Sequence, residues 1–448
     1  MSEDSYSTSM SSDDEYYGDN GEEFRGSVLN NNYTLIDKIG YGSYSSVWLS
    51  YSLKDEKYYA IKIQNSEDYT EGLEELKILK KIKELNSEYF VKMIEGFEII
   101  KKEEKINKVK KGKKTFLKKS TVINKFICMV LPIMAGSIYS LIKNKQFKDG
   151  LNDFLMNKII VCLVNSVYDL HKNLEICHTD LKPENLLIDG LSSRVNELID
   201  EYNKHNIKKL YNKKLEDEVL KKGLDNSNIN HKKKIRKLKS YILKKIHESI
   251  LESMISLANT ESDYNDSNID SDDSDSCSDK IHKINERYLQ NPKIVLTDFG
   301  SSVKIKELDN EEIQTRYYRA PEVILEMDYD EKIDIWSIGC ILFELYTGKI
   351  LFDPDKDDDF SRDFHHLFMI KEICGDFPKD FIRKSPVKED YFKDYKLKCK
   401  KEIKKLDFST LICKENKDCK ILDLMQKCLI IDPRKRPSIE YIKNFIFS

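Results

Sequence analysis

The chain has 448 residues, of which 40% are hydrophobic and 34% are charged, and its formal net charge is −3. This length suits one large enzyme with insertions or two to three domains, with enough apolar residues for a core. The longest apolar run, residues 126–134, and the ten cysteines without a CxxC pair exclude a membrane span and a disulfide-rich secreted protein. We expect a reduced intracellular protein in the cytoplasm, the nucleus or both.

Strand patterns dominate the first part of the chain after an acidic, serine-rich start. Residues 1–32 carry mostly Ser, Asp, Glu, Tyr and Asn, which predicts a disordered N-terminal tail. Residues 33–40, 45–52 and 57–64 alternate or combine β-branched and aromatic residues, which predicts three strands. Residues 70–85 have apolar side chains at helical spacing and predict an amphipathic helix.

Helical patterns follow two further strands. We predict these strands within residues 90–100 and 124–133, separated by a basic hairpin loop at 101–125 that holds eleven lysines. Residues 155–173 are typical of the helices that come later. Strands followed by helices predict an α+β fold with two lobes. The predicted lobes are residues 33–134, β-rich with one main helix, and residues 135–448, α-helical.

A long polar segment, residues 190–292, interrupts the helical lobe. Its first part is lysine-rich with helical periodicity, and its second part, residues 259–279, is an acidic serine tract that cannot bury itself. The motifs on either side belong together, so we predict an insertion that loops out of the domain as a spacer. The acidic tract would be solvated, or would fold back onto the lysine-rich half.

A glycine-rich stretch, IGYGSYSSV, follows the first predicted strand. Gly40 and Gly42 would let the backbone approach a phosphate without side-chain obstruction, whereas a flexible hairpin turn is the alternative. The candidate nucleotide-binding residues here are Ile39, Gly40, Tyr41, Gly42, Ser43, Tyr44, Ser45, Ser46 and Val47.

Lys62 ends the motif YAIK, fifteen residues after that loop. A strand lysine is usually solvated, but Glu75 on the next helix is placed to form the ion pair that holds a phosphate-binding lysine. Glu74 is the neighbouring candidate, and Glu75 is preferred because it shares a helix face with Leu79. We predict that Lys62 contacts the α- and β-phosphates of ATP and that Ala60 leaves room for adenine.

Two later motifs supply the residues for phosphoryl transfer. In HTDLKPEN, Asp180 would accept the proton of a hydroxyl nucleophile and Lys182 would neutralise charge on the phosphoryl group. Asn185 of the same motif and Asp298 of DFG would hold Mg²⁺.

The ordered series of these motifs, followed by APE, resembles a eukaryotic-type protein kinase over residues 33–446, apart from the insertions. DLKPEN and the Thr315 before RYYRAPE resemble serine/threonine rather than tyrosine kinases. The resemblance implies a two-lobed fold, ATP with Mg²⁺, and transfer of the γ-phosphoryl group to protein serines and threonines. It also implies a buried ion pair between Glu322 and Arg436, and contacts from Asp334 to the catalytic-loop backbone.

Finer segments, such as GSYSSVWLS, CHTDLKPENLL and FSRDFHHL, are similar to the SR-protein kinase (SRPK) family of the CMGC group. That family also has Ser at the position of Ser45 and a long spacer before DFG. The resemblance implies Leu131 as gatekeeper and a hinge in which Pro132 offers its carbonyl, and Met134 its N–H, to adenine. It also implies Leu187 as a nucleotide-binding residue.

SRPK relatives recognise arginine-rich substrates partly through an acidic docking groove. Lys349 and His365 stand where acidic residues are expected, whereas Glu372 matches and the run at 353–359 could restore negative charge. Arg/Ser-rich substrates are therefore one option. Thr179 replaces an arginine that in many kinases binds an activation-segment phosphate, so we predict activity without such phosphorylation.

Two other function classes stay open. One is a pseudokinase or interaction scaffold, although the chain keeps the strand lysine, the catalytic aspartate and both metal ligands. The other is an RNA-associated protein acting through the basic segments 101–125 and 231–239, although lysine runs are more often only solvated. We expect protein substrates, no membrane partner and a monomer.

Overall fold

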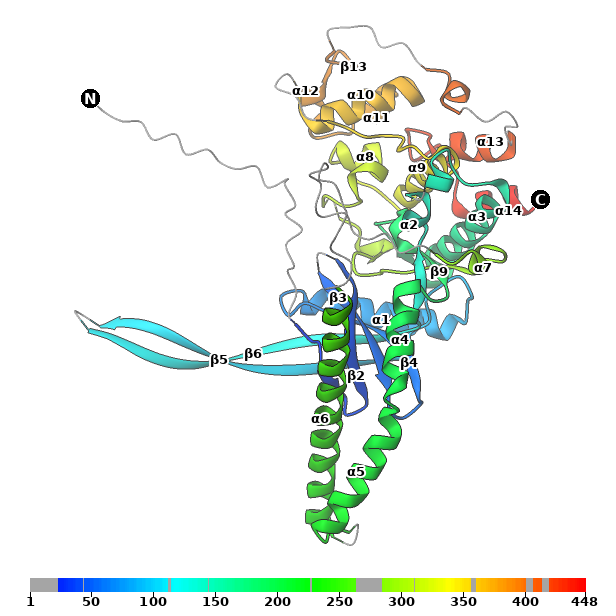
Figure 1. The fold of residues 1–448 in the computed structure, drawn as a ribbon. Coiled ribbons are helices and arrows are strands. Elements are labelled where there is room, and N and C mark those ends of the chain that lie inside the picture. Colours follow the sequence, from blue (N-terminus) through cyan, green and yellow to red (C-terminus); the bar gives the residue numbers. More distant parts are fainter. Residues whose placement is uncertain are drawn as a thin grey trace.

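A six-stranded antiparallel sheet forms most of the N-terminal lobe in the computed structural model (Figure 1). Its order is β1–β2–β3–β4–β6–β5. The strands are β1 Val28–Leu29, β2 Tyr33–Gly42, β3 Ser45–Ser52, β4 Lys57–Gln64, β5 Glu95–Lys111 and β6 Lys114–Leu131. The structure describes residues 23–42, 44–111, 114–143, 145–225, 228–262, 284–309, 311–355, 360–399, 406–412 and 419–448.

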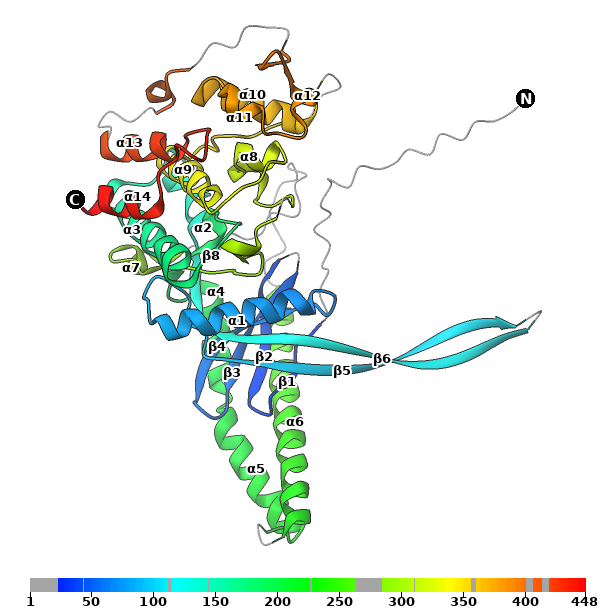
Figure 2. The same cartoon turned by 180° about the vertical axis from the view of Figure 1, so that it is seen from behind.

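Helix α1, Tyr69–Leu85, covers this sheet on the side of the other lobe (Figure 2). It buries Leu76, Leu79 and Ile82, whose spacing of three residues places them on one face. The helix ends at Asn86, which adopts a left-handed φ of 52° and so stops the helical ladder. The predicted strands at 33–64 and the predicted helix at 70–85 are therefore confirmed.

The C-terminal lobe is helical and is built around α9, Lys332–Thr347, whose residues from Ile333 to Tyr346 are all buried. A helix that is buried on every side is necessarily rich in apolar residues. Helix α3, Asp153–Tyr168, packs beside it and continues as a π-helical turn, Asp169–Leu174. The other helices are α2 Ile138–Ile142, α7 Glu286–Leu289, α8 Pro321–Ile324, α10 Arg362–Cys374, α11 Lys379–Ile382, α12 Lys388–Tyr391, α13 Cys419–Cys428 and α14 Ile439–Phe447.

Short strands lie where the lobes meet. Strands β7 Met134–Ser137, β9 Leu186–Asp189 and β10 Ile294–Leu296 form a sheet of order β10–β9–β7. The remaining pairs are β8 Ile176–Cys177 with β11 Val303–Lys304, and β12 Phe392–Lys393 with β13 Lys396–Leu397. The two-lobed α+β fold is confirmed. No helix in the described parts of the chain is both long and apolar enough to cross a membrane.

The basic segment 101–125 consists of strands rather than the predicted loop. Strands β5 and β6 stay paired out to Lys111 and Lys114, and the hairpin projects far from the lobe (Figures 1 and 2). The prediction of a loop was wrong because pairing satisfies the backbone of both strands, which outweighs the low strand propensity of lysine.

The prediction of a disordered tail over residues 1–32 is also wrong for its last part. Phe24 is buried edge-on against Trp48 and Phe126, with ring centroids 6.2 and 5.3 Å away, and residues 28–29 form β1. An aromatic side chain that fills the lobe core orders the polar residues next to it. Residues 1–22 lie outside the described part of the chain.

The inserted segment forms three helices, α4 Ser193–Lys204, α5 Ile207–Lys221 and α6 Ile229–Ser262, that pack against the N-terminal lobe (Figure 1). Apolar residues of α4–α6 share one core with residues of β2, β3 and β4. The buried members are Ile36, Leu49, Tyr51, Leu53, Ala60, Ile133, Val195, Tyr202, Ile207, Tyr211, Leu238, Ile242, Leu243, Ile246, Ile250, Leu251 and Met254.

A buried hydrogen-bond chain fixes these helices to the sheet. The Tyr202 hydroxyl lies 3.0 Å from Thr34 Oγ1 and 2.9 Å from His247 Nδ1. Burial lowers the pKa of His247 to about 4, so the ring is neutral at pH 7. Its Nε2 donates to the carbonyl of Leu35 at 2.8 Å, so Nδ1 accepts from Tyr202.

The prediction of a looped-out spacer is therefore wrong for residues 193–254. Lysines dominate the composition and hide an apolar stripe that recurs at helical spacing and is buried in the fold. Residues 263–283, which contain most of the acidic tract, lie outside the described part of the chain.

Candidate active site

Carboxylates from both lobes meet at Lys62, near the end of β4. Its Nζ donates to Glu75 Oε1 and Oε2 at 2.7 and 2.9 Å, and to Asp298 Oδ1 at 2.8 Å. The expected pair with Glu75 is thus present, whereas Glu74 pairs with Lys77 on the surface of α1. These contacts join α1, β4 and the segment after β10 into one unit.

The charges in this cluster stabilise one another. Burial disfavours the Lys62 ammonium, but the carboxylates of Asp298 and Glu75 outweigh it and raise the lysine pKa. Lys62 in turn lowers the pKa of Asp298 to about 2 against the effect of burial. Asp298 is therefore ionised at neutral pH, as a ligand for a cation must be.

Asp180 lies within reach of a hydroxyl group. Thr315 Oγ1 donates to Asp180 Oδ1 at 2.6 Å, and the Thr315 N–H donates to the same oxygen at 3.2 Å. Lys182 Nζ lies 2.8 Å from Asp180 Oδ2 and donates to Thr315 Oγ1 at 3.1 Å. A carboxylate that holds a hydroxyl at this distance has the geometry of a general base.

Pairing between β9 and β10 brings the two candidate metal ligands together although the insertion separates them in sequence. Thr297 N–H donates to the carbonyl of Asn185 at 3.0 Å, directly before Asp298. Asn185 Nδ2 donates to the carbonyl of Asp180 at 2.8 Å, which leaves Oδ1 for another partner. An amide oxygen beside a carboxylate fits the all-oxygen coordination of Mg²⁺.

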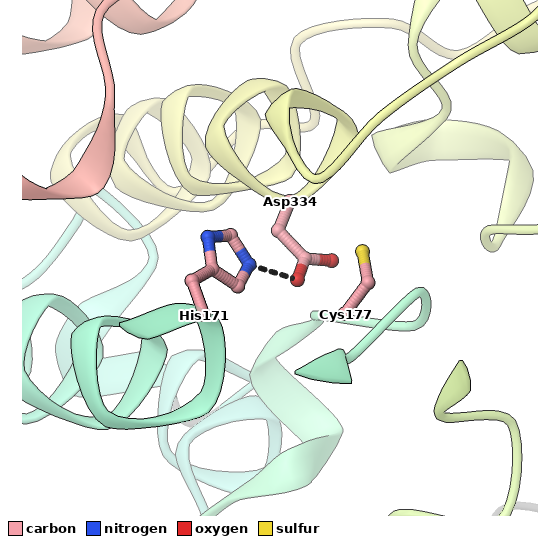
Figure 3. A group of neighbouring side chains, drawn as sticks. All are labelled: His171, Cys177 and Asp334. Atoms are coloured by element: carbon pink, nitrogen blue, oxygen red, sulfur yellow. Dashed lines mark hydrogen bonds and ion pairs between the residues drawn. The ribbon is translucent and has the colours of Figure 1, made fainter. Parts of the chain in front are cut away.

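Asp334 of α9 fixes the backbone of the catalytic loop, the motif HTDLKPEN at residues 178–185. Its Oδ2 accepts from the N–H of His178 at 2.8 Å, and its Oδ1 accepts from the N–H of Thr179 at 2.9 Å. His171 Nε2 donates to Oδ2 at 2.8 Å (Figure 3). Burial raises the pKa of Asp334, but these hydrogen bonds outweigh it and lower the pKa, so a carboxylate persists there.

Figure 3 shows that Cys177 completes a buried trio with His171 and Asp334. The three side chains lie close enough to hold a metal ion. However, both carboxylate oxygens already accept hydrogen bonds, and burial raises the thiol pKa far above its usual value. A protonated thiol is a poor ligand, so we assign the trio a structural role.

The buried ion pair expected in the helical lobe is also present. Arg436 donates to Glu322 through Nη1 at 2.7 Å and through Nη2 at 3.0 Å, and both side chains are fully buried. This bidentate geometry anchors the end of the activation segment, residues 298–322, to the loop before α14.

Thr179 links the catalytic loop to the activation segment without a phosphate. Its backbone has a φ of 67°, unusual for a β-branched residue, and its Oγ1 donates to the carbonyl of Ser301 at 2.6 Å. Further along, Arg319 pairs with Glu312 at 2.5 Å, and Arg316 pairs with Asp363 at 2.5 Å. Unmodified side chains therefore order the described part of this segment.

From these contacts we expect the purified enzyme to keep most of its activity after treatment with a broad-specificity phosphatase. The contacts of the Thr179 hydroxyl and the Glu312 carboxylate order the activation segment, as an arginine–phosphate pair does in many kinases. Peptide phosphorylation is measured before and after treatment, with mass spectrometry to confirm that Ser301, Ser302 and Thr315 are unmodified. Loss of nearly all activity would contradict this account.

The glycine-rich loop is the tip of the β2–β3 hairpin. Gly42 pairs with Ser45, and a Cβ on Gly42 would meet no atom within 4 Å, so its backbone borders open space. Tyr41 and Tyr44 are 56% and 61% exposed. Ser46 points elsewhere, because its hydroxyl accepts from Trp48 Nε1 at 2.9 Å inside the lobe.

The other nucleotide candidates lie on neighbouring strands. Val47 is opposite Lys62, and Ala60 is opposite Leu131 in the strand pairing. The hinge follows at Pro132, and β7 begins at Met134, while Leu187 pairs with Ser137 in the next sheet. Ser43 lies outside the described residues.

Three residues near the catalytic loop were missed from the sequence. The Tyr318 hydroxyl donates to Glu344 Oε2 at 2.6 Å, and Glu184 lies close enough to influence the titration of both. Glu184 Oε2 is buried without a hydrogen-bond partner among the described residues. Burial raises the pKa of Glu184 and raises that of Glu344 to about 7. Only the position of Glu184 within KPEN could have drawn attention to this group.

Comparison with known proteins agrees with this geometry. A family model described as the protein kinase domain matches residues 33–201 and 282–447. A serine/threonine-protein kinase of Acanthamoeba polyphaga mimivirus is 29% identical, covering 86% of this chain and 80% of that protein. The serine/threonine-protein kinase SRPK of Physarum polycephalum is 30% identical, covering 82% and 72%. One solved kinase domain, 22% identical, has a TM-score of 0.59 over 95% of this chain and 98% of its own, which shows the fold.

Proposed function

Because this chain belongs to the protein kinase family and is an SRPK-like serine/threonine kinase, we propose that it phosphorylates serines and threonines that lie beside arginine. The contact of Lys62 with Glu75 and Asp298 supports the transfer reaction, since it assembles groups from both lobes. The buried Oε2 of Glu184 and the buried carboxyl group of Glu344 support the arginine preference.

In this proposal ATP lies between the lobes, with its phosphates near Lys62 and its adenine between Ala60 and the hinge. Asn185 and Asp298 would hold Mg²⁺, which neutralises phosphate charge when bound. Asp180 orients the substrate hydroxyl and accepts its proton, and Lys182 neutralises charge on the transferred group. The proposed nucleotide contacts are Ile39, Gly40, Tyr41, Gly42, Ser43, Tyr44, Ser45, Val47, Leu131, Pro132, Met134 and Leu187.

We assign the selection of arginine to Glu184 and Glu344 rather than to the groove near α10. His365 stands where acid is expected, and its ring packs against Phe360 and Phe368, with centroids 5.2 and 6.3 Å away. Asp363 already pairs with Arg316. By contrast, Glu184 has a buried oxygen without a partner, as a guanidinium site requires. Residues 356–359 lie outside the described part of the chain.

We expect the KM of an arginine-containing peptide to fall by up to about tenfold between pH 6 and pH 8, following one ionisation near pH 7. The group responsible is Glu344, which accepts a hydrogen bond from the Tyr318 hydroxyl. Burial raises the pKa of Glu344 to about 7; the Tyr318 hydrogen bond lowers it, the charge of Glu184 raises it, and the charge of Lys143 lowers it. As pH rises, Glu344 loses a proton and gains the charge that binds a guanidinium. Steady-state kinetics across this pH range measure the effect.

Matched variants separate this effect from general loss of activity. Glu344→Gln should raise the KM and abolish its pH dependence, while Glu389→Gln, an exposed glutamate of α12, should leave both unchanged. With a peptide that has alanine in place of arginine, the unmodified enzyme and both variants should have the same KM. An unchanged KM in Glu344→Gln would rule out the arginine site, whereas failure of every peptide would count against the transfer reaction itself.

A further inference from the structure

A row of exposed residues runs along α6 on the side away from the N-terminal lobe. This basic stripe consists of Lys234, Lys237, Tyr241, Lys244 and Lys245. Their separations of three, four, three and one residues place them on one face of a helix. Tyr241 is 62% exposed in the middle of the row. This large aromatic side chain between four lysines presents most of its surface to solvent.

The opposite face of α6 holds the stripe in place. Leu238, Ile242 and Ile246 are buried in the core that α6 shares with β2 and β3. His247 adds the hydrogen bond to the carbonyl of Leu35. The helix backbone that carries the stripe is therefore fixed before any partner arrives, which lowers the entropic cost of binding.

Positive charge dominates the segment from the end of α4 to Lys245, which includes α5 and the first half of α6. Residues 204–245 contain fifteen Lys and Arg residues and four Asp and Glu residues, a difference of +11. Lys244 and Lys245 pair with Glu248, but these exposed pairs are weak and leave the ammonium groups accessible. Figures 1 and 2 show α5 and α6 extending beyond the sheet, away from the C-terminal lobe. A partner bound there would not cover the active site.

We propose that the basic stripe binds single-stranded nucleic acid. The lysines contact successive phosphates, and one base stacks on the ring of Tyr241. Lysine alone would suit any polyanion, but an exposed aromatic ring among the lysines favours a ligand that carries both phosphates and flat bases. An acidic peptide would pair with the lysines but would supply no base to stack on Tyr241.

The chain's own acidic tract is a poor occupant for geometric reasons. The two ends of the stripe, Lys245 and Lys234, lie 17 and 28 residues before Ser262. These separations correspond to about 25 and 42 Å along the helix axis. The 21 residues from 263 to 283 span at most about 70 Å and must also return to Ile284, which contacts Gly136 at the hinge. Following the stripe to Lys234 takes about 42 Å of that length before the chain turns back.

Fluorescence anisotropy with labelled 20-nucleotide RNA and DNA strands of mixed sequence tests the proposal on the full-length protein. We expect binding whose logarithmic salt dependence has a slope of about −3, from four phosphate contacts on a single strand. Changing Lys234, Lys237, Lys244 and Lys245 to Gln should weaken binding at least about tenfold and flatten the slope. Tyr241→Ala should weaken binding about fivefold or more at an unchanged slope.

The matched control changes four exposed lysines of the C-terminal lobe, Lys379, Lys384, Lys393 and Lys396, to Gln. This variant should bind like the unmodified protein, and all variants should keep their peptide-kinase activity. Equal affinity for RNA and DNA would mean that the sugar is not read, whereas tighter RNA binding would identify RNA as the ligand. Loss of binding in the control variant, or preference for a peptide of residues 259–279 over both strands, would overturn the proposal.

Discussion

Asp180→Asn is expected to lower the rate of peptide phosphorylation by about 10² to 10⁴-fold while ATP affinity changes little. The substitution keeps the shape of the side chain but removes the base that takes the hydroxyl proton. Asn185, the proposed metal ligand, bonds to the backbone carbonyl of Asp180 and not to its carboxylate. The nucleotide site should therefore survive the change.

Two measurements separate the chemical step from binding. Transfer of labelled phosphate gives the rate, and titration of the protein with a fluorescent ATP analogue in Mg²⁺ gives the affinity. Asp390→Asn, a change of an exposed carboxylate on α12, is the matched control and should behave like the unmodified enzyme. Full activity of purified Asp180→Asn would remove this residue from the mechanism.

Tyr202→Ala is expected to destabilise the protein by about 3–5 kcal/mol, the range for loss of a large buried ring. The ring packs against Tyr51 and Tyr58, with centroids 5.9 and 6.3 Å away. The same change breaks the hydrogen bonds to Thr34 and His247. This residue lies in the insertion, so its effect measures how far the insertion belongs to the kinase lobe.

Urea unfolding followed by tryptophan fluorescence measures this effect, since Trp48 lies in the same lobe. Tyr241→Ala, on the exposed side of α6, is the matched control and should change the free energy of unfolding by no more than about 0.5 kcal/mol. Tyr202→Phe should fall between the two, because it keeps the ring and loses the hydroxyl. Equal midpoints for Tyr202→Ala and Tyr241→Ala would show that the insertion is a separate appendage.

Local patterns were sufficient to predict strands β2, β3 and β4 of the N-terminal lobe and its main helix. Alternating polar and apolar residues in β2–β4 indicate strands, and the apolar spacing of α1 indicates a helix, because each pattern matches the period of its backbone. The pairing of Lys62 with Glu75 was also predicted, from the motif of a phosphate-binding lysine and from the helix face that Glu75 shares with Leu79. Motif order then indicated the family.

The errors share a physical cause, which is contact between segments far apart in sequence. The β5–β6 ladder depends on the pairing of two lysine-rich strands, and neither strand alone indicates it. The packing of α4–α6 depends on apolar residues of β2 and β3 that precede them by more than a hundred positions. The group of Glu184, Tyr318 and Glu344 forms only when the catalytic loop, the activation segment and α9 come together.

A positional-scanning peptide library with the purified protein and Mg²⁺–ATP tests the central claim most directly. We predict phosphate incorporation into serine and threonine but not tyrosine, selection of arginine next to the acceptor, and loss of both signals in Asp180→Asn. Incorporation that ignores arginine or favours acidic peptides would contradict the proposed substrate class. Incorporation that persists unchanged in Asp180→Asn would contradict the assignment of the active site.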